Sequence, residues 1–405
     1  MSKILGIIAE YNPFHYGHLY HIQQSKKLIN PDYTVCVISG NFVQRGEPSL
    51  IDKWSKTQIA LKYGFDMVIE LPTVYSISSA ENFAEGAIKI LDVFDDVTLS
   101  FGSEVGDLSI LNEFVDILWN EPKEYLTILR HELAKGISYP KARDNALMLY
   151  LNNVRKYANV LSNPNNILAI EYLKAIKKLK SKIKPITIKR IGTEYNSLIL
   201  NGNFASATAI RNLINNNKDI KSLLPKTSFK IVSQNTKYGK IIKNLYAFEK
   251  EIIYTLRKMS IEEIHNLQDV SEGLENLIKQ AANSCNNLED LIDIVKTKRY
   301  TRSRIQRILL YALLNITKKD IQISYKTKPY IRVLGITSRG KSLLAEINNS
   351  KCSVITSLKK FIIINDNKVL KNMLEKDILA TNIYTLGYEY DSKANLDYTQ
   401  KLIIE

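Results

Sequence analysis

The sequence predicts an α/β fold, with a doubly wound parallel sheet in its first half and a mainly α-helical, basic region after it. Up to about residue 190, short apolar runs alternate with amphipathic segments, which is the βαβα pattern of a parallel sheet covered by helices on both faces. Beyond about residue 226, apolar residues recur three and four positions apart, which indicates helices. A length of 405 residues predicts two or three domains.

Five apolar runs in the first half are expected to be strands, because each is short and rich in Val, Ile or Leu. They are Ile4–Ala9, Thr34–Ser39, Met67–Leu71, Asp96–Phe101 and Ile183–Ile188. The segments between them predict helices, the last of which follows the turn residues Asn163-Pro164-Asn165-Asn166. These helices are Leu19–Leu28, Asp52–Tyr63, Ala80–Leu91, Leu108–Trp119, Lys123–Lys135, Lys141–Leu151 and Ile167–Leu179.

Ala205–Asn215 predicts a further helix, since Ser206 and Thr208 supply hydroxyls suited to its cap. The polar run Asn215–Lys218 marks a boundary, so we expect one domain over residues 1–220 and a second region over residues 221–405. In the second region, the pattern predicts helices at Tyr238–Arg257, Ile261–Leu267, Ser271–Ala282, Leu288–Lys296 and Thr301–Asn315, a strand at Ile331–Ile336, a turn at Gly340 and a strand at Phe361–Ile364.

Composition indicates a cytoplasmic protein. No run reaches the roughly 18 uncharged apolar residues of a membrane span, and the first residues lead directly into a strand without a signal-peptide pattern. The three cysteines, Cys36, Cys285 and Cys352, are scattered, which predicts reduced thiols rather than a disulfide framework or a zinc site.

The net charge of +15 is unevenly distributed along the chain. Residues 1–215 carry 24 Lys and Arg against 21 Asp and Glu, whereas residues 216–405 carry 32 against 20. An AT-rich genome would account for many lysines, but not for their segregation into one half. A polyanionic partner such as RNA would explain why the second half is basic.

The segment from Lys3 to His18 carries the strongest chemical signal. A strand runs into a turn and then into a helix that opens on His15-Tyr16-Gly17-His18. A helix N-terminus offers unpaired N–H groups to phosphate, and Gly17 lacks the Cβ that would keep a triphosphate away. His15 and His18 could donate to phosphoryl oxygens as charge develops, so we expect them to be catalytic in nucleotidyl transfer.

Polar clusters follow three of the predicted strands. His15–His18 follows the first, Gly40–Gly46 the second, and Gly102-Ser103-Glu104 the strand Asp96–Phe101. Ligands of doubly wound sheets bind at the carboxyl ends of the strands, where the strand order reverses. These clusters are therefore expected along one edge of the sheet.

Two of the six ordered segments that carry a family resemblance are GIIAEYNPFHYGHL (Gly6–Leu19) and SGNFVQRGEP (Ser39–Pro48). Through these segments the chain resembles the tRNA(Met) cytidine acetate ligase family of the HIGH-type nucleotidyltransferase superfamily, over essentially its whole length. The aminoacyl-synthetase signature KMSKS is absent, and Lys258-Met259-Ser260 lies in a helical region and is interpreted as chance. The segments that carry the resemblance are GIIAEYNPFHYGHL (Gly6–Leu19), SGNFVQRGEP (Ser39–Pro48), FGSE (Phe101–Glu104), PNNILAIEY (Pro164–Tyr172), KRIG (Lys189–Gly192) and SATAIR (Ser206–Arg211).

The resemblance implies a Rossmann-like ATP-binding catalytic domain over residues 1–220 and a tRNA-binding region over residues 221–405. Acetate would attack the α-phosphate of ATP to give acetyl-adenylate and pyrophosphate. The acetyl group would then pass to the N4 amine of the wobble cytidine of elongator tRNA(Met), giving N4-acetylcytidine. ATP, with Mg²⁺, is the implied co-substrate, and acetyl-coenzyme A is not needed. A monomer and a homodimer fit the sequence equally.

The resemblance also suggests the residues that bind each substrate. Apart from the resemblance, the glycine ends of the loop that holds Gly40, Asn41, Gln44 and Arg45 make it a candidate lid or RNA-facing loop, with a purely structural loop as the alternative. Glu10 and Glu104 are candidate Mg²⁺ ligands, but no metal residue is assigned, since Mg²⁺ usually arrives with ATP. The expected ATP-binding residues are Gly6, Ile7, Ile8, Ala9, Glu10, Tyr11, Asn12, Pro13, Phe14, His15, Tyr16, Gly17, His18, Leu19, Tyr20, Gly102, Asn165, Arg190 and Ile191, with Ser206, Thr208 and Arg211 at the pyrophosphate end.

For tRNA, the strongest signal is the basic segment KTKRYTRSRIQR. On a helix, residues three apart share a face that could meet phosphates, so Lys296, Arg299 and Arg302 are expected to lie together. A solvated basic face is the competing interpretation. The expected tRNA-binding residues are Lys296, Lys298, Arg299, Arg302, Arg304 and Arg307.

Two other functions compete with the ligase. An adenylyltransferase acting on a small cofactor precursor would keep the same nucleotide site but would leave the basic half unused. A non-catalytic RNA-binding protein with a vestigial nucleotide pocket is disfavoured, because both histidines and the glycine of the phosphate loop are intact.

Overall fold

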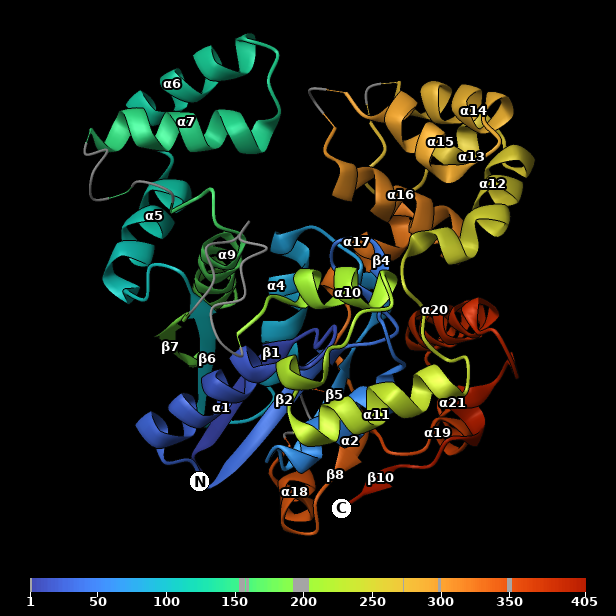
Figure 1. Ribbon diagram of the computed structural model, residues 1–405. Coiled ribbons are helices and arrows are strands. Elements are labelled where there is room, and N and C mark those ends of the chain that lie inside the picture. Colours follow the sequence, from blue (N-terminus) through green and yellow to red (C-terminus); the bar gives the residue numbers. More distant parts are fainter. Residues whose placement is uncertain are drawn as a thin grey trace.

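The computed structural model describes residues 2–152, 157, 160–191, 204–271, 273–297, 300–347 and 352–405. Within these residues, a sheet of eight strands forms the centre, in the order β10-β8-β5-β2-β1-β6-β7, with β9 beside β8 (Figure 1). The strands are β1 (Ile4–Ala9), β2 (Tyr33–Ser39), β5 (Met67–Leu71), β6 (Val97–Ser103), β7 (Lys184–Lys189), β8 (Tyr330–Ile336), β9 (Ser353–Ile355) and β10 (Ile403–Ile404). A separate hairpin pairs β3 (Phe42–Val43) with β4 (Glu47–Pro48).

The strand order reverses at β1. β2 and β6 flank it on opposite sides, both parallel to it, and Gly6 of β1 is aligned with Val35 and with Leu99. β5 continues the sheet beyond β2, and β7 continues it beyond β6. Because ligands bind outside the carboxyl ends of the strands at such a reversal, the fold places the site just after Ala9.

Alternate residues of the strands enter two separate apolar cores, one on each face of the sheet. Ile4 and Val37 belong to the core that includes α4 and α9, whereas Leu5 and Cys36 belong to the core that includes α1, α2, α10 and α11. The predicted doubly wound α/β fold is therefore confirmed. The helices up to residue 237 are α1 (Tyr16–Ile29), α2 (Lys53–Lys62), α3 (Thr73–Ser76), α4 (Ala80–Leu91), α5 (Leu108–Asn120), α6 (Lys123–Ala134), α7 (Tyr139–Leu151), α9 (Pro164–Lys178), α10 (Ala207–Asn215) and α11 (Lys226–Lys237).

The second half is mainly helical, as predicted, and also returns to the sheet. β8 pairs antiparallel with β5, and β10 pairs with β8, so the sheet takes strands from both sides of residue 220. A division at that residue remains a proposal. The helices here are α12 (Glu249–Lys258), α13 (Ile261–His265), α14 (Leu274–Ser284), α15 (Leu288–Val295), α16 (Arg302–Leu314), α17 (Lys318–Lys326), α18 (Leu343–Glu346), α19 (Leu358–Ile364), α20 (Lys368–Tyr384) and α21 (Leu396–Thr399), with 3-10 turns at Lys221–Leu223, Leu245–Phe248, Arg339–Ser342 and Thr385–Gly387.

Two expectations about the second half are wrong. The long helix expected at Tyr238–Arg257 is interrupted, because α11 ends at Lys237 and Gly239 adopts a φ of +63° before α12 begins at Glu249. Phe361–Ile364 is the end of helix α19 rather than a strand, and Ile363 and Ile364 are exposed. A short apolar run has no periodicity that distinguishes a helix from a strand.

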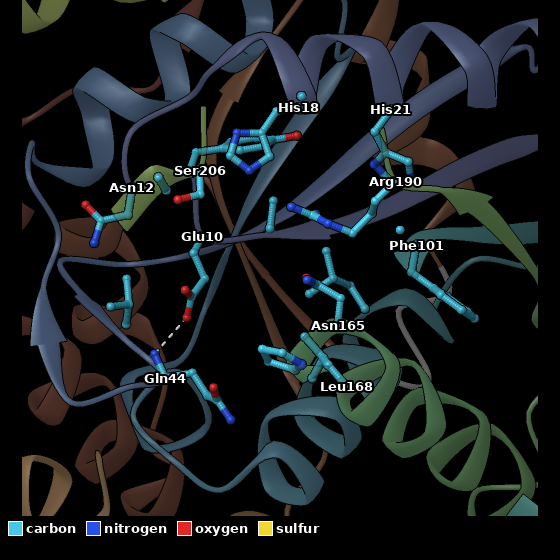
Figure 2. Close-up of a pocket in the computed structure, with 18 of the residues that line it drawn as sticks. Glu10, Asn12, His18, His21, Gln44, Phe101, Asn165, Leu168, Arg190 and Ser206 are labelled. Carbon is cyan, nitrogen blue, oxygen red and sulfur yellow. Dashed lines mark hydrogen bonds between the residues drawn. The ribbon is translucent and has the colours of Figure 1, made fainter. Parts of the chain in front are cut away.

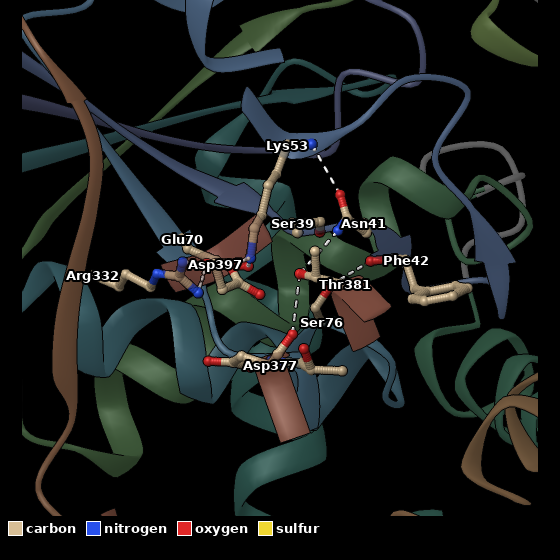
Figure 3. A network of polar contacts seen from close by, with 12 residues as sticks. Ser39, Asn41, Phe42, Lys53, Glu70, Ser76, Arg332, Asp377, Thr381 and Asp397 are labelled. Atoms are coloured by element: carbon tan, nitrogen blue, oxygen red, sulfur yellow. Dashed lines mark hydrogen bonds and ion pairs between the residues drawn. The ribbon is translucent and has the colours of Figure 1, made fainter. Parts of the chain in front are cut away.

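A buried network of charges joins the two halves (Figure 3). Lys53 of α2 contacts Glu70 of β5 at 2.7 Å and Asp397 of α21 at 2.8 Å. Arg332 of β8 also pairs with both carboxylates. All four side chains are almost completely buried, so their charges must balance one another inside the protein.

In the part of the chain that the structure describes, no helix is long and apolar enough to cross a membrane.

Candidate active site

A cavity of about 590 Å³ opens at the carboxyl end of β1, where the strand order reverses. Its wall is built from the loop between β1 and α1, the ends of β6 and β7, the first turns of α9 and α10, and the hairpin that follows β2. Figure 2 shows side chains from these elements, including Glu10, His18, Asn165 and Arg190, around one common space. The predicted clustering at one edge of the sheet is thus confirmed.

His15 and His18 form a reciprocal cap at the N-terminus of α1. The N–H of Gly17 donates to Nδ1 of His15 at 3.0 Å, and the N–H of His15 donates to Nδ1 of His18 at 3.2 Å. A neutral imidazole whose Nδ1 accepts must carry its proton on Nε2. Both rings, which stack at 3.8 Å between centroids, therefore have Nε2–H as their donor, and both line the cavity.

The surroundings keep these rings neutral. Burial, and then the positive charge of Arg190, lowers the pKa of His15 to about 3. The same two causes lower the pKa of His21, one turn beyond His18, to about 4. Burial and the neighbouring His15 lower the pKa of His18 as well. At neutral pH, without a bound anion, the rings are therefore uncharged. They offer hydrogen-bond donors rather than positive charges.

Gly17 has a structural role that the sequence did not indicate. A Cβ on this residue would lie 2.9 Å from Cε1 and 3.0 Å from Nδ1 of His15. The glycine therefore leaves room for the His15 ring as well as for a ligand, since it also lines the cavity.

The structure separates the roles of the two neighbouring asparagines at the start of α9. Asn166 is buried, and its Oδ1 accepts from the N–H groups of Glu104 and Val105 at 2.9 and 3.1 Å. Asn165 lines the cavity and donates to Oε1 of Glu104 at 2.5 Å. Asn166 thus fixes the turn after β6, while Asn165 faces the ligand space.

Glu104 caps α9 and is not part of the cavity wall. Its Oε2 accepts from the N–H of Asn166 at 3.0 Å. Arg190, which follows β7, lies 3.9 Å from the same carboxylate through its Nε. Arg190, Ile191 and Gly102, which are expected to bind ATP, all line the cavity.

The first turn of α10 forms the opposite wall. Ser206 caps the helix by accepting from the N–H of Ala209 at 3.1 Å, and Thr208 lies beside it on the wall. Arg211 donates to the carbonyl of Asn12 at 2.8 Å and to Oε2 of Glu47 at 3.1 Å. These contacts join α10 to the loop after β1 and to the hairpin.

The buried Lys56 supports the floor of the cavity. Its Nζ donates to the carbonyls of Glu10, Ser39 and Gly40, at 3.2, 2.8 and 2.7 Å, and to Oγ of Ser49 at 2.7 Å. These carbonyls lie where β1 and β2 end, so one cation holds the two strand ends together. Burial lowers the pKa of Lys56 to about 7.

Most residues expected to bind ATP line the cavity. Five do not: Gly6 lies within β1 beside Leu91 and Val97, and the others, in the loop before α1 or on α1, are Pro13, Phe14, Tyr16 and Leu19. The lining residues from that expectation are Ile7, Ile8, Ala9, Glu10, Tyr11, Asn12, His15, Gly17, His18, Tyr20, Gly102, Asn165, Arg190, Ile191, Ser206, Thr208 and Arg211.

The loop after β2 faces the cavity at only one end. Gln44 and Arg45 line it. Asn41 is buried instead, where its amide donates to Thr381 at 3.2 Å and its Oδ1 accepts from the N–H of Lys53 at 2.9 Å. A Cβ on Gly40 would lie 2.7 Å from Oε1 of Glu70. The start of the loop is therefore fixed in the interior.

Sequence reasoning missed His21 and the apolar wall of the cavity. His21 follows His18 by three residues, a spacing that could have placed it on the same helix face. The apolar side chains come from separate elements, so no local pattern identified them. They are Phe83, Phe101, Ile167, Leu168 and Tyr172.

The basic cluster is arranged differently from the single helix face expected. Lys296 follows the end of α15, while Arg302 begins α16, because Thr301 caps a new helix. Lys298 and Arg299 lie outside the described residues. Arg302 donates to Glu289 at 2.8 Å and to Tyr246 at 2.7 Å, and Arg304 donates to the carbonyl of Asp269. Arg307 pairs with Asp269 at 2.9 Å and also lines the cavity.

No group of three or more His, Cys, Asp and Glu residues suited to holding a metal ion occurs among the described residues.

Comparison with known proteins identifies the family. A family model described as HIGH Nucleotidyl Transferase matches residues 2–399. The tRNA(Met) cytidine acetate ligase of Thermoanaerobacter sp. (strain X514) is 47% identical over 406 residues, which cover 99% of each chain. The protein of the same name from Acetivibrio thermocellus is 43% identical over 99% of this chain and 100% of its own.

Solved structures agree with this match. The crystal structure of apo Thermotoga maritima TmcAL has a TM-score of 0.93 with this chain, at 35% identity and with 99% of each chain covered. The crystal structure of the same protein bound with α-thio ATP has a TM-score of 0.90, at the same identity and coverage. The chain therefore belongs to the HIGH nucleotidyl transferase family and, within it, to the family of the tRNA(Met) cytidine acetate ligases.

Proposed function

We propose that this protein is an ATP-dependent acetate–tRNA ligase that makes N4-acetylcytidine at the wobble position of elongator tRNA(Met). The observation that carries the proposal is the neutral histidine pair at the N-terminus of α1, whose two Nε2–H groups are available to the cavity at the reversal of the sheet. The names of the full-length relatives support the choice of acetate and tRNA(Met) as substrates.

The first step is the adenylation of acetate. The triphosphate of ATP lies at the start of α1, where the positive end of the helix dipole and the two Nε2–H groups meet the phosphoryl oxygens. An acetate oxygen attacks the α-phosphorus, a new P–O bond forms, and the bond to the β,γ-pyrophosphate breaks. Negative charge grows on the phosphoryl oxygens during this displacement, and preorganised donors stabilise it more than they stabilise bound ATP.

Other residues hold the remaining parts of ATP. Arg190 lies close enough to the histidines to lower the pKa of both, so its guanidinium is well placed to meet the phosphates. Ser206, Thr208 and Arg211 face the pyrophosphate end. Asn165 and Gly102 border the adenosine. Mg²⁺ accompanies the triphosphate and would neutralise part of its charge, and we assign no protein ligand to it.

The second step transfers the acetyl group to tRNA. The basic second half offers Lys296, Arg302, Arg304 and Arg307, together with Lys298 and Arg299, for contacts with the RNA backbone. Arg307 is the member of this set that reaches the cavity wall. Because tRNA is a cytoplasmic substrate, the proposal places the protein in the cytoplasm.

The test is to incubate the purified protein with ATP, Mg²⁺, labelled acetate and total tRNA. We expect label in tRNA as N4-acetylcytidine, and loss of that label in His18→Ala. Acetate-dependent pyrophosphate exchange without label in tRNA would show that the acceptor is wrong. Absence of both activities would reject the ligase in favour of a cofactor adenylyltransferase or an RNA-binding protein.

A further inference from the structure

The transfer step needs a group that accepts a proton. The N4 amine of cytosine is a weak nucleophile, because its lone pair is delocalised into the ring. As this nitrogen bonds to the acetyl carbon, it becomes acidic and must lose one proton before a neutral amide is formed. A base in contact with that nitrogen speeds such a step by about 10²–10⁴-fold.

His15 and His18 cannot accept this proton, because each uses Nδ1 to accept a backbone N–H and carries a hydrogen on Nε2. His21 already uses its Nε2 in a hydrogen bond with Oγ of Ser100 at 3.0 Å. The hydroxyl of Tyr172 is also unsuitable, since burial, and then the nearby charge of Glu10, raises its pKa well above its ordinary value. The candidate bases that we consider are the carboxylates of the cavity wall.

Two carboxylates line the cavity among the described residues, Glu10 and Glu47. Glu47 is paired with Arg211 at 3.1 Å, which neutralises it. Glu10 accepts a hydrogen bond at 2.8 Å through Oε1 from the N–H of Gln44, and Lys56 holds its carbonyl oxygen rather than its carboxylate. Glu10 thus has a fixed orientation and keeps acceptor capacity for a ligand.

The position of Glu10 also fits an acceptor base. Figure 2 shows its carboxylate projecting from the end of β1 into the space between His18 and Ser206 on one side and Leu168 on the other. Phe83, Leu168 and Tyr172 form the apolar wall. A flat pyrimidine ring and the methyl of an acetyl group could pack on such a wall, with the phosphates on the histidine side.

We propose that Glu10 contacts the N4 amine of the acceptor cytidine and takes its proton during transfer, an inference that rests on the proposed function. The N4 nitrogen attacks the carbonyl carbon of acetyl-adenylate, and a C–N bond forms. The bond between that carbon and the phosphate oxygen breaks, and AMP leaves with the electron pair. The proton from N4 passes to the Glu10 carboxylate and then to water.

The experiment measures the two half-reactions separately in Glu10→Gln. Gln keeps the size and the acceptor oxygen that binds the N–H of Gln44, but it is not a base. We expect the single-turnover transfer from enzyme-bound acetyl-adenylate to tRNA to slow by about 10²–10⁴-fold. The acetate-dependent exchange of pyrophosphate should fall much less, and it also reports that the variant is folded.

Two further variants decide between roles for Glu10. In Glu10→Ala, added azide should restore part of the transfer rate, because a small anion can occupy the space and accept the proton. Glu47→Gln, the matched control, should slow exchange at least as much as transfer, because its partner Arg211 faces the pyrophosphate end and pyrophosphate has left before transfer.

Two outcomes would overturn the proposal. Equal losses of exchange and transfer in Glu10→Gln, relieved by more Mg²⁺, would make Glu10 a metal ligand instead, and an unchanged transfer rate would give it no role in proton transfer. Failure of the wild type to acetylate tRNA would reject the proposed function itself.

Discussion

Substitutions of His15 should separate its role as a helix cap from its role as a donor. The amide oxygen of Asn occupies the position of Nδ1, whereas the amide nitrogen of Gln occupies that of Nε2. His15→Asn should therefore keep the hydrogen bond from Gly17, at 3.0 Å in the native protein, and lose the Nε2–H that lines the cavity. His15→Gln should keep a donor at the position of Nε2 and lose the hydrogen bond from Gly17.

The expected magnitudes follow from these contacts. Loss of a preorganised donor to a developing oxyanion costs about 2.7–4 kcal/mol, so kcat of pyrophosphate exchange should fall by about 10²–10³-fold in His15→Asn. Asn is among the best N-cap residues, so its free energy of unfolding should stay within about 0.5 kcal/mol of wild type. His15→Gln should lose about 1 kcal/mol of stability through the missing cap and keep more of the exchange activity.

Exchange kinetics and urea unfolding, measured on both variants, provide the test. We expect His15→Asn to lose mainly activity and His15→Gln to lose mainly stability. If His15→Asn exchanged pyrophosphate at the wild-type rate, the Nε2–H of His15 would not contact phosphate. If both variants lost the same stability, the ring would stabilise α1 through stacking on His18 rather than through its cap.

Three further predictions concern stability. The pKa values of His15 and His21 lie at about 3 and 4 in the folded state, below their ordinary value of 6.5, so the unfolded chain binds more protons below pH 6.5 and stability should fall there. Between pH 7 and pH 5, the two rings together should lower the free energy of unfolding by about 4 kcal/mol. Urea midpoints that stay constant over this range would contradict the prediction. Asp397→Asn should destabilise the fold by about 3–5 kcal/mol in urea unfolding, since it removes a buried counter-charge of Lys53, whereas the exposed Asp391→Asn should be near neutral. Asn166→Ala should cost about 1–3 kcal/mol by leaving two backbone N–H groups without an acceptor, and an unchanged melting curve would show that water replaces its amide.

The sequence was most informative where local pattern and tertiary environment agree. The bounds of β5 and α4 were predicted to the residue, because an apolar run in the first and a regular spacing of apolar residues in the second end at clear turn or cap residues. The position of β8 was also predicted within one residue, but its pairing with β5, some 260 residues earlier, was not. No local signal encodes which distant strand completes a sheet edge.

The same contrast holds for the site. His15, His18 and Gly17 lie in one contiguous motif, so their shared position at the cavity could be predicted from a strand, a turn and a helix start. Sequence alone could not decide between Asn165 and Asn166, because the choice depends on which side chain meets the turn after β6. The prediction that the basic cluster shares one helix face was wrong for a different reason. Thr301 caps a new helix within the basic segment, so Lys296 and Arg302 do not lie on the same helix.

The pairing of β5 with β8 bears on how the protein is made. During synthesis, β5 would emerge long before its partner, and at about 5–20 residues per second the delay is roughly 13–53 s. An unpaired apolar edge strand is an aggregation hazard during such a delay. Glu70 places a carboxylate within that strand, and Lys53 is already present to pair with it. A charged side chain within an edge strand disfavours its pairing with another chain, and Arg332 and Asp397 complete the charge network only when β8 and α21 have been made.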